Sequence, residues 1–304
     1  MEICKPRPPE EPEYNNADFN ARALSKLKVY EARRHLVLKP NEYPRFLYKY
    51  FSDVTKDEYL NDVIIDCDLY LNSPDDFNDP FDTSAKLVCE STPSELRKRF
   101  SDIVKKRSSE VTKKEREGMV TNMMVKHSAN NNEWISDTFK KNTSSAGVFC
   151  MTTDPRNILM WSHYGGKHKG VVLQFEIARD PRSLLYALKV HYSNEYPIYN
   201  YAYEMDTDTF NAVMLRKAEA WRYEEEWRIL RVGGAHTFQP FKPHAMTGVI
   251  FGCKATENFK EKIRHLIKRR QEKYGQDIKF FQSIQNGSKY AVSISSEPRA
   301  CKTI

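Results

Sequence analysis

The sequence predicts an α+β fold, in which a central mixed or antiparallel sheet is flanked by helices. Segments with strand patterns outnumber those with helical patterns, and the connections between them vary in length. A doubly wound sheet would instead alternate strands and helices regularly. The sequence contains no internal repeat, no Gly-x-Gly-x-x-Gly and no Walker loop, so the two common phosphate-binding loops give no support for nucleotide binding.

The composition indicates a folded protein without a membrane span. Of the 304 residues, 40% are hydrophobic, which is enough for a sizeable core. No apolar run approaches the roughly 18 residues of a membrane span, and the N-terminus lacks a signal-peptide core. The six cysteines are scattered without a Cys-x-x-Cys pair, which argues against a zinc ribbon or a disulfide framework. We therefore expect a cytoplasmic protein with free thiols.

Residues 1–20 predict a flexible tail, because four prolines lie among glutamates and asparagines. Residues 21–304 predict a single α+β domain with a helical excursion at about 94–142. A short helix at 21–37 is expected to pack on this domain. The stretch 93–141 is polar, rich in helix formers and poor in Gly and Pro, so we expect two or three helices there.

The first strand is predicted at residues 44–51, where Phe46, Tyr48 and Tyr50 alternate along one face. A second strand at 63–71 ends at an Asn-Ser-Pro turn signal. After the helical stretch, the apolar run at 147–152 predicts a third strand.

The middle of the chain predicts a helix at 156–164, which Asp154 and Pro155 can cap and two glycines stop. The strand that follows, at 170–177, opens with continuous apolar residues, so we expect it at the centre of the sheet. The later elements follow from the same patterns. In order, they are a strand at 185–192, a helix at 207–219, a strand with glutamates at 221–232, a strand at 248–251, a helix at 256–274, and strands at 278–284 and 290–294.

The densest chemical pattern is the run from Trp221 to Arg228, which places three glutamates between aromatic residues. On a strand, Glu224 and Glu226 would share one face. Two carboxylates on one face repel, so one of them would keep its proton or serve a cation or a sugar. The alternative is the solvated start of a strand, with both tryptophans in the core and Arg228 pairing with one glutamate. Both interpretations stay open.

A second cluster contains His163 and His168, between a predicted helix end and a strand. The two histidines are five residues apart across two glycines, which is no usual metal-ligand spacing, so we expect no metal. Cys150 and His163 could form a nucleophile pair, although Cys150 lies in an apolar strand, where cysteines are commonly structural. The alternative for the cluster is a tight turn whose histidines bond to the backbone.

The loop Phe77–Asp82 carries polar groups between two aromatic residues. Asn and Asp beside Pro commonly form a self-bonded turn, which favours a structural role. In the functional alternative, Asn78 or Asp79 projects toward the same cleft as His163 and Glu226. The net charge of +7 is compatible with a polyanionic partner, but many enzymes share it. Basic residues concentrate at 97–126 and 260–273, where interspersed acids favour solvated helix faces.

Four separated blocks are arranged in the order seen in a known family. These blocks are Leu47–Tyr50, Ser73–Asp82, Met160–Tyr164 with His168–Val171, and Trp221–Arg228. Together they resemble a bacterial family of unknown function, domain-of-unknown-function family 2971. The resemblance covers roughly residues 44 to 255, and the family name implies no activity.

The glutamate block is also similar to that of ADP-ribosyltransferases, which run from an early-strand His, Arg or Tyr through a middle-strand motif to a late-strand glutamate. Their arginine-modifying branch uses Glu-x-Glu, the form of residues 224–226. The resemblance implies an NAD-consuming glycosyltransferase, with NAD as substrate. In it, Glu226 stabilises the oxocarbenium character at the cleaved nicotinamide–ribose bond, and Glu224 orients the acceptor. The chain lacks the Ser-Thr-Ser of the middle strand and has no early-strand Arg or His.

The resemblance also implies the surroundings of the substrate. Tyr48 or Tyr50 would contact the nicotinamide or adenosine end, and His163 or Tyr164 would line the pocket. The full set of expected substrate-binding residues is Tyr48, Tyr50, Asn78, Asp79, His163, Tyr164, His168 and Arg228. A protein or a nucleic acid would accept the ADP-ribose, and a role as a toxin or antiphage effector would fit such a protein.

Two alternatives belong to other classes. In a nuclease, four carboxylates (Asp79, Asp82, Glu224 and Glu226) would hold Mg²⁺ while the basic helices follow phosphates. In a non-catalytic binding module, the motifs would brace a pocket or a partner surface. Geometry separates the three: carboxylates gathered around one position favour the nuclease, and a lone glutamate facing an aromatic-lined cleft favours the transferase. Buried carboxylates that are all paired with arginines favour the binding module.

Overall fold

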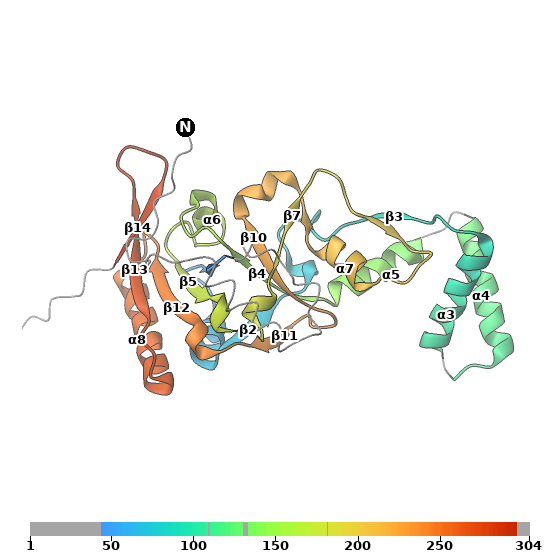
Figure 1. Cartoon of the computed structure of the whole chain (residues 1–304), viewed down its shortest axis with the longest axis horizontal. Coiled ribbons are helices and arrows are strands. Elements are labelled where there is room, and N and C mark those ends of the chain that lie inside the picture. Colours follow the sequence, from blue (N-terminus) through green and yellow to red (C-terminus); the bar gives the residue numbers. More distant parts are fainter. Residues whose placement is uncertain (1–43, 109, 130–132, 181, 297–304) are drawn as a thin grey trace, which may run out of the picture. The chain divides into compact units, whose positions relative to one another are not determined.

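The computed structural model describes residues 44–108, 110–129, 133–180 and 182–296, which form two compact units (Figure 1). The first unit contains the described residues up to Asn72, together with Gly147–Val190 and those from Ala220 onward. The second contains Ser73–Ala146 and His191–Glu219. The tail predicted at 1–20 and the helix predicted at 21–37 lie outside the described residues. That the units fold as one domain stays a prediction.

An eight-stranded sheet organises the first unit, in the order β14-β13-β12-β5-β1-β4-β10-β6. Strands β12 and β13 are parallel and every other neighbouring pair is antiparallel. The predicted α+β class with a mixed sheet is therefore confirmed. The strands are β1 (Phe46–Phe51), β4 (Gly147–Thr152), β5 (Val171–Glu176), β6 (Leu188–Lys189), β10 (Glu226–Arg231), β12 (Met246–Phe251), β13 (Lys279–Gln285) and β14 (Val292–Ser296).

Alternation along the strands gives the sheet two buried faces. On one face, Leu47 and Trp227 belong to the main core, which also takes in the apolar side of α8 (Glu257–Tyr274). On the other face, Tyr48 and Tyr50 pack with Trp161 of α6 (Ile158–His163). The alternation predicted for the first strand is thus confirmed. This unit also contains α2 (Asp57–Asn61), the π-helical turn Asp62–Asp66, and the pair of β2 (Asp68–Leu71) with β11 (Thr237–Pro240).

The second unit contains the predicted helical excursion. Its helices are α3 (Pro93–Arg107), α4 (Lys113–Ser128), α5 (Glu133–Ser144) and α7 (Thr207–Met214). Capping boxes begin α3 and α4, because Thr92 and Thr112 each exchange hydrogen bonds with a glutamate three residues later. Two short parallel pairs complete the unit: β3 (Lys86–Val88) with β8 (Ile198–Asn200), and β7 (His191–Tyr192) with β9 (Arg216–Lys217).

Several predicted elements need correction. The helix predicted at 207–219 ends at Met214 and is followed by β9. Residues 62–66 are helical rather than extended, because their three consecutive apolar residues are all buried and Cys67 turns the chain with a φ of 60°. The strand predicted at 185–192 is interrupted by the 3-10 turn Leu184–Tyr186. Helix α6 starts later than predicted, since Asn157 accepts the amides of its first turn. Among the helices that the structure describes, none has the length and apolarity to cross a membrane.

Candidate functional site

Three neighbouring strands bring Tyr48, Thr152 and Glu226 into one row. In the sheet register, Thr152 of β4 lies directly opposite Tyr48 of β1 on one side and Glu226 of β10 on the other. Side chains of directly opposed residues point to the same face, so the three form a continuous line. All three are buried. Gln174 of β5 extends the row, and its Nε2 donates to the Tyr48 hydroxyl at 3.2 Å.

A two-point ion pair holds Glu226. Arg228 lies two residues further along β10 and donates its Nε to Glu226 Oε1 at 2.8 Å and its Nη2 to Oε2 at 3.1 Å. The arginine is fully buried, and the glutamate is 5% exposed. Such a charge-assisted fork fixes the carboxylate in both position and plane. This pair is the one that the alternative interpretation of the glutamate run expected.

Glu224 is positioned by a different part of the backbone. It ends the 3-10 segment Glu219–Glu224, and its buried carboxylate accepts a hydrogen bond from the Tyr164 hydroxyl at 2.7 Å. The expectation that Glu224 and Glu226 follow one another on a strand is wrong. Glu225 between them is exposed and left-handed, with a φ of 44°, and β10 begins only at Glu226.

A hydrogen bond joins the start of α6 to the 3-10 segment Glu219–Glu224. Asn157 caps α6 with its side-chain oxygen and donates its Nδ2 to the Tyr223 carbonyl at 2.8 Å. The same residue therefore fixes both the helix that carries Tyr164 and the turn that carries Glu224. Thr153 adds a second link, because its hydroxyl donates to Glu225 Oε2 at 2.6 Å.

The two predicted histidines have different surroundings. His163 is exposed at the end of α6, with its ring edge-on to Tyr164. His168 is half-buried and left-handed, and its ring lies nearly parallel to that of Trp161. Burial and the nearby Lys254 lower the pKa of His168. In the described parts of the chain, no three His, Cys, Asp or Glu side chains are gathered to hold a metal ion.

Tyr50 is buried in the cluster that contains Tyr48 and Trp161. Its ring meets Trp161 edge-to-face at 5.1 Å, and its hydroxyl donates to the Asp154 carbonyl at 3.1 Å. Burial raises the pKa of Tyr50 well above its ordinary value, so the phenol stays neutral. Of the two predicted tyrosines, Tyr48 is the one in the row with Glu226.

Cys150 lies opposite Arg228 on the same face of the sheet. Burial, together with the nearby Glu226 carboxylate, raises the pKa of its thiol. A thiol with a raised pKa is protonated at neutral pH and makes a poor nucleophile. The geometry therefore favours the structural interpretation of Cys150 over the nucleophile pair with His163.

The loop Phe77–Asp82 belongs to the second unit. Asp79 accepts the backbone amide of Phe81 at 3.0 Å, which is the self-bonded turn that the sequence predicted, and Asn78 is exposed. Asp82 is buried 3.6 Å from Lys217 Nζ. The loop forms one wall of a cavity of about 450 Å³, which is also lined by Asp75, Ser84, Leu87, Ser136, Phe139 and Lys140. That Asn78 or Asp79 shares a cleft with Glu226 stays a prediction, because they belong to separate units.

Residues 160–229 match the family described as "Protein of unknown function (DUF2971)". The matched stretch includes Glu224 and Glu226 together with Tyr164 and Arg228, which donate hydrogen bonds to them. The resemblance to this family is thereby confirmed for residues 160–229. No curated protein and no solved structure matches the chain.

Sequence reasoning missed Thr152, Gln174 and Asn157. A polar residue at the end of the apolar run 147–152 was the available signal for Thr152. Its two cross-strand partners depend on register, which local patterns do not determine when the paired strands are more than 70 residues apart.

Proposed function

We propose that this chain is an NAD-consuming enzyme of the ADP-ribosyltransferase type. The row of Tyr48, Thr152 and Glu226 across three adjacent strands carries the proposal. An early-strand aromatic residue, a polar residue on the middle strand and a late-strand glutamate would then face one substrate. The order of these residues along the chain resembles that of ADP-ribosyltransferases. Their alignment in the sheet register supports the proposal.

The proposed chemistry begins with cleavage of the bond between nicotinamide and ribose C1′. The bonding electrons leave with nicotinamide, and positive charge develops on the ribose. The Glu226 carboxylate stabilises that charge through the ribose hydroxyls, while Arg228 holds the carboxylate in its orientation. A nucleophilic atom of the acceptor then bonds to C1′ and releases its proton to solvent, with Glu224 orienting the acceptor. An electrostatic group of this kind is typically worth roughly 100-fold to 1,000-fold in rate.

One observation favours a second candidate, the non-catalytic binding module. Both oxygens of Glu226 are bonded to Arg228, and both side chains are buried. A buried pair with these contacts would equally serve to brace the sheet. Glu224, the other buried carboxylate, accepts a hydrogen bond from a tyrosine hydroxyl.

The deciding experiment measures nicotinamide release from NAD⁺ by the purified chain, with cell lysate as the acceptor source. Wild type is compared with Glu226→Gln and with the double variant Glu226→Gln/Arg228→Met, which removes both charges of the pair. Release by wild type and by neither variant, with cooperative thermal unfolding in all three, would support the transferase. Absence of release from folded wild type would favour the binding module. A role as a toxin or antiphage effector is part of the proposal, and toxicity of the wild type but not of Glu226→Gln on expression would test it.

A further inference from the structure

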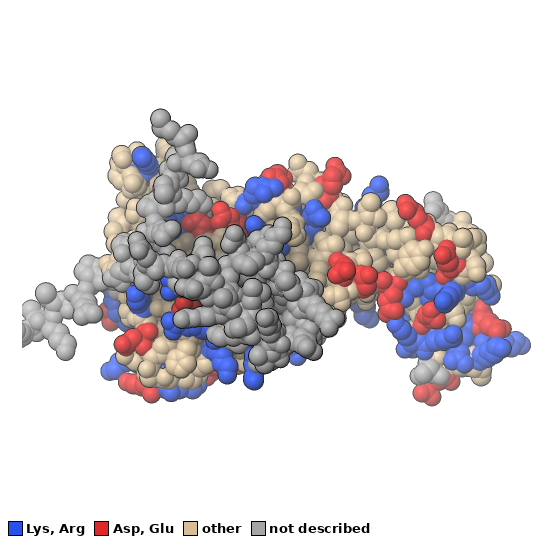
Figure 2. All heavy atoms as spheres, in the orientation of Figure 1, with Lys and Arg blue, Asp and Glu red and all other residues tan. Residues whose placement is uncertain are grey.

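The positive charge of the chain is concentrated in two helices of the second unit. Helices α3 and α4 contain ten lysines and arginines against four aspartates and glutamates, a formal net charge of +6. The whole chain carries +7. Figure 2 shows the Lys and Arg side chains gathered over these helices, at the right of the view. The rest of the chain therefore sums to +1, although α8 alone carries seven lysines and arginines against three glutamates, a net +4.

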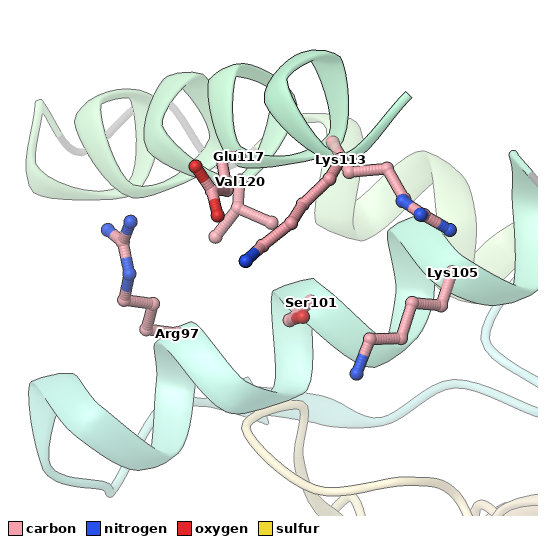
Figure 3. Close-up of a pocket in the computed structure, with 7 residues that line it drawn as sticks. Arg97, Ser101, Lys105, Lys113, Glu117 and Val120 are labelled. Atoms are coloured by element: carbon pink, nitrogen blue, oxygen red, sulfur yellow. The ribbon is translucent and has the colours of Figure 1, made fainter. Parts of the chain in front are cut away.

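A groove between α3 and α4 collects part of this charge. It has a volume of about 440 Å³ and is lined by Arg97, Ser101, Lys105, Lys113, Arg116, Glu117 and Val120. In Figure 3, Arg97 and Lys113 extend into it from opposite helices. The lining follows helical periodicity, since the α3 residues are four apart and the α4 residues recur every three or four positions, at 113, 116 and 117, and 120. Each helix thus presents one face to the groove.

Two acids of the helices lie close to this groove: Asp102, 3.9 Å from Lys105 Nζ in an exposed pair, and Glu117 in the lining itself. Glu95 and Glu115 are engaged in the capping boxes at the helix starts, where hydrogen bonds from Thr92 and Thr112 lower the pKa of each carboxyl. Of the seven lining residues, four are cationic and Glu117 alone is acidic. The groove therefore has a net positive lining.

We propose that this groove is a docking surface for the phosphate backbone of duplex DNA. Arg97 and Lys105 are eight residues apart on α3, or roughly 12 Å along the helix axis, and they can contact several successive phosphates of one strand. The Ser101 hydroxyl between them is a further phosphate donor.

The same lining argues against other nucleic acids. It contains no aromatic ring on which the bases of a single strand could stack. Apart from Ser101, its polar groups are charged, so it offers few neutral groups to recognise the 2′-hydroxyls by which duplex RNA is read. Recognition of DNA through phosphates alone is independent of base sequence. The inference does not depend on NAD chemistry.

The test is fluorescence anisotropy with the full chain and a labelled 20-base-pair DNA duplex of mixed sequence, over a series of salt concentrations. Four phosphate contacts predict a slope of log K against log salt of about −3.6. The variant Arg97→Gln/Lys113→Gln should bind about 10-fold more weakly at 100 mM salt, and its slope should be shallower by about 1.8.

The matched control is Lys98→Gln/Lys114→Gln, which removes the same charge from the neighbouring exposed positions of the same helices. It should keep more of the affinity than the groove variant. A second groove variant, Lys105→Gln/Arg116→Gln, covers the case in which the first fails to fold. Equal losses in groove and control variants would overturn the assignment to the groove. Tighter binding of duplex RNA or single-stranded DNA, or absence of DNA binding at 50 mM salt, would overturn the choice of partner.

Discussion

Tyr48 on β1 and Glu226 on β10 both lie directly opposite Thr152, so one residue of β4 sets the spacing between them. Two strand spacings of about 4.8 Å place their backbones roughly 10 Å apart. The ladder between β4 and β10 is six residue pairs long, and β1, which pairs with β4 at this one position, is held to β5 by a further six pairs. The relative position of the tyrosine and the glutamate is therefore a property of the sheet and not of a loop.

The Glu226–Arg228 ion pair of β10 should make a large contribution to the free energy of unfolding. Arg228→Met removes the two hydrogen bonds that Arg228 donates to the buried Glu226 carboxylate, and should lower the free energy of unfolding by roughly 3–5 kcal/mol. Adding Glu226→Gln removes the charge of that carboxylate and should restore most of that loss. Urea unfolding of the two variants beside wild type measures both effects. If the double variant is as unstable as Arg228→Met, the ion pair does not account for the contribution of these two residues to the free energy of unfolding.

Tyr164→Phe removes the hydroxyl that donates to the buried Glu224. Loss of a hydrogen bond to a charged group should cost about 1.5–3 kcal/mol of unfolding free energy. If Glu224 orients the acceptor, transfer to acceptors should fall more than hydrolysis of NAD⁺. The control is Tyr290→Phe, because Tyr290 is fully exposed. Equal stability of the two variants would contradict the bond, and equal loss of transfer and hydrolysis would contradict the assigned role of Glu224.

His168 should make stability depend on pH. Its pKa in the folded protein lies below the ordinary 6.5 through burial and Lys254, so the unfolded chain binds the proton more readily. Stability should therefore fall as pH decreases below about 6.5. In His168→Asn, which keeps a residue that tolerates the left-handed backbone, the fall should be smaller. Urea unfolding between pH 5 and 7.5 provides the comparison, and parallel curves for the two proteins would rule out this contribution.

Two glycines should respond in opposite directions to the same substitution. A Cβ at Gly170 would lie 2.0 Å from the carbonyl oxygen of Phe51, at the end of the β1–β5 ladder, so Gly170→Ala should be strongly destabilising. Gly118 lies within α4 with nothing within 4 Å, and Gly118→Ala should gain about 0.5–1 kcal/mol from helix propensity. Thermal unfolding of both variants tests the pair. A neutral Gly170→Ala would contradict the close approach.

The parts of the fold that local periodicity determines were predictable. Phe46, Tyr48 and Tyr50 alternate in the sequence and share a face in the structure, and the apolar run 170–177 is a central strand. The Glu226–Arg228 pair could also be anticipated, since residues two apart on a strand point the same way. The start of β10 could not, because the left-handed Glu225 is held by contacts with Thr153, 72 residues away. The row through Thr152 depends on register between distant strands, which no local pattern encodes.

The second unit is built from two separate stretches of chain, with Gly147–Val190 of the first unit synthesised between them. At about 5–20 residues per second, the ribosome needs roughly 2–9 seconds for that interval. During it, Asp82 has been made while Lys217, its partner in a buried ion pair, has not. Strand β3 is likewise synthesised before β8, the strand with which it pairs. Completion of the second unit must follow emergence of most of the polypeptide, and neither of its stretches is expected to form that unit when expressed alone.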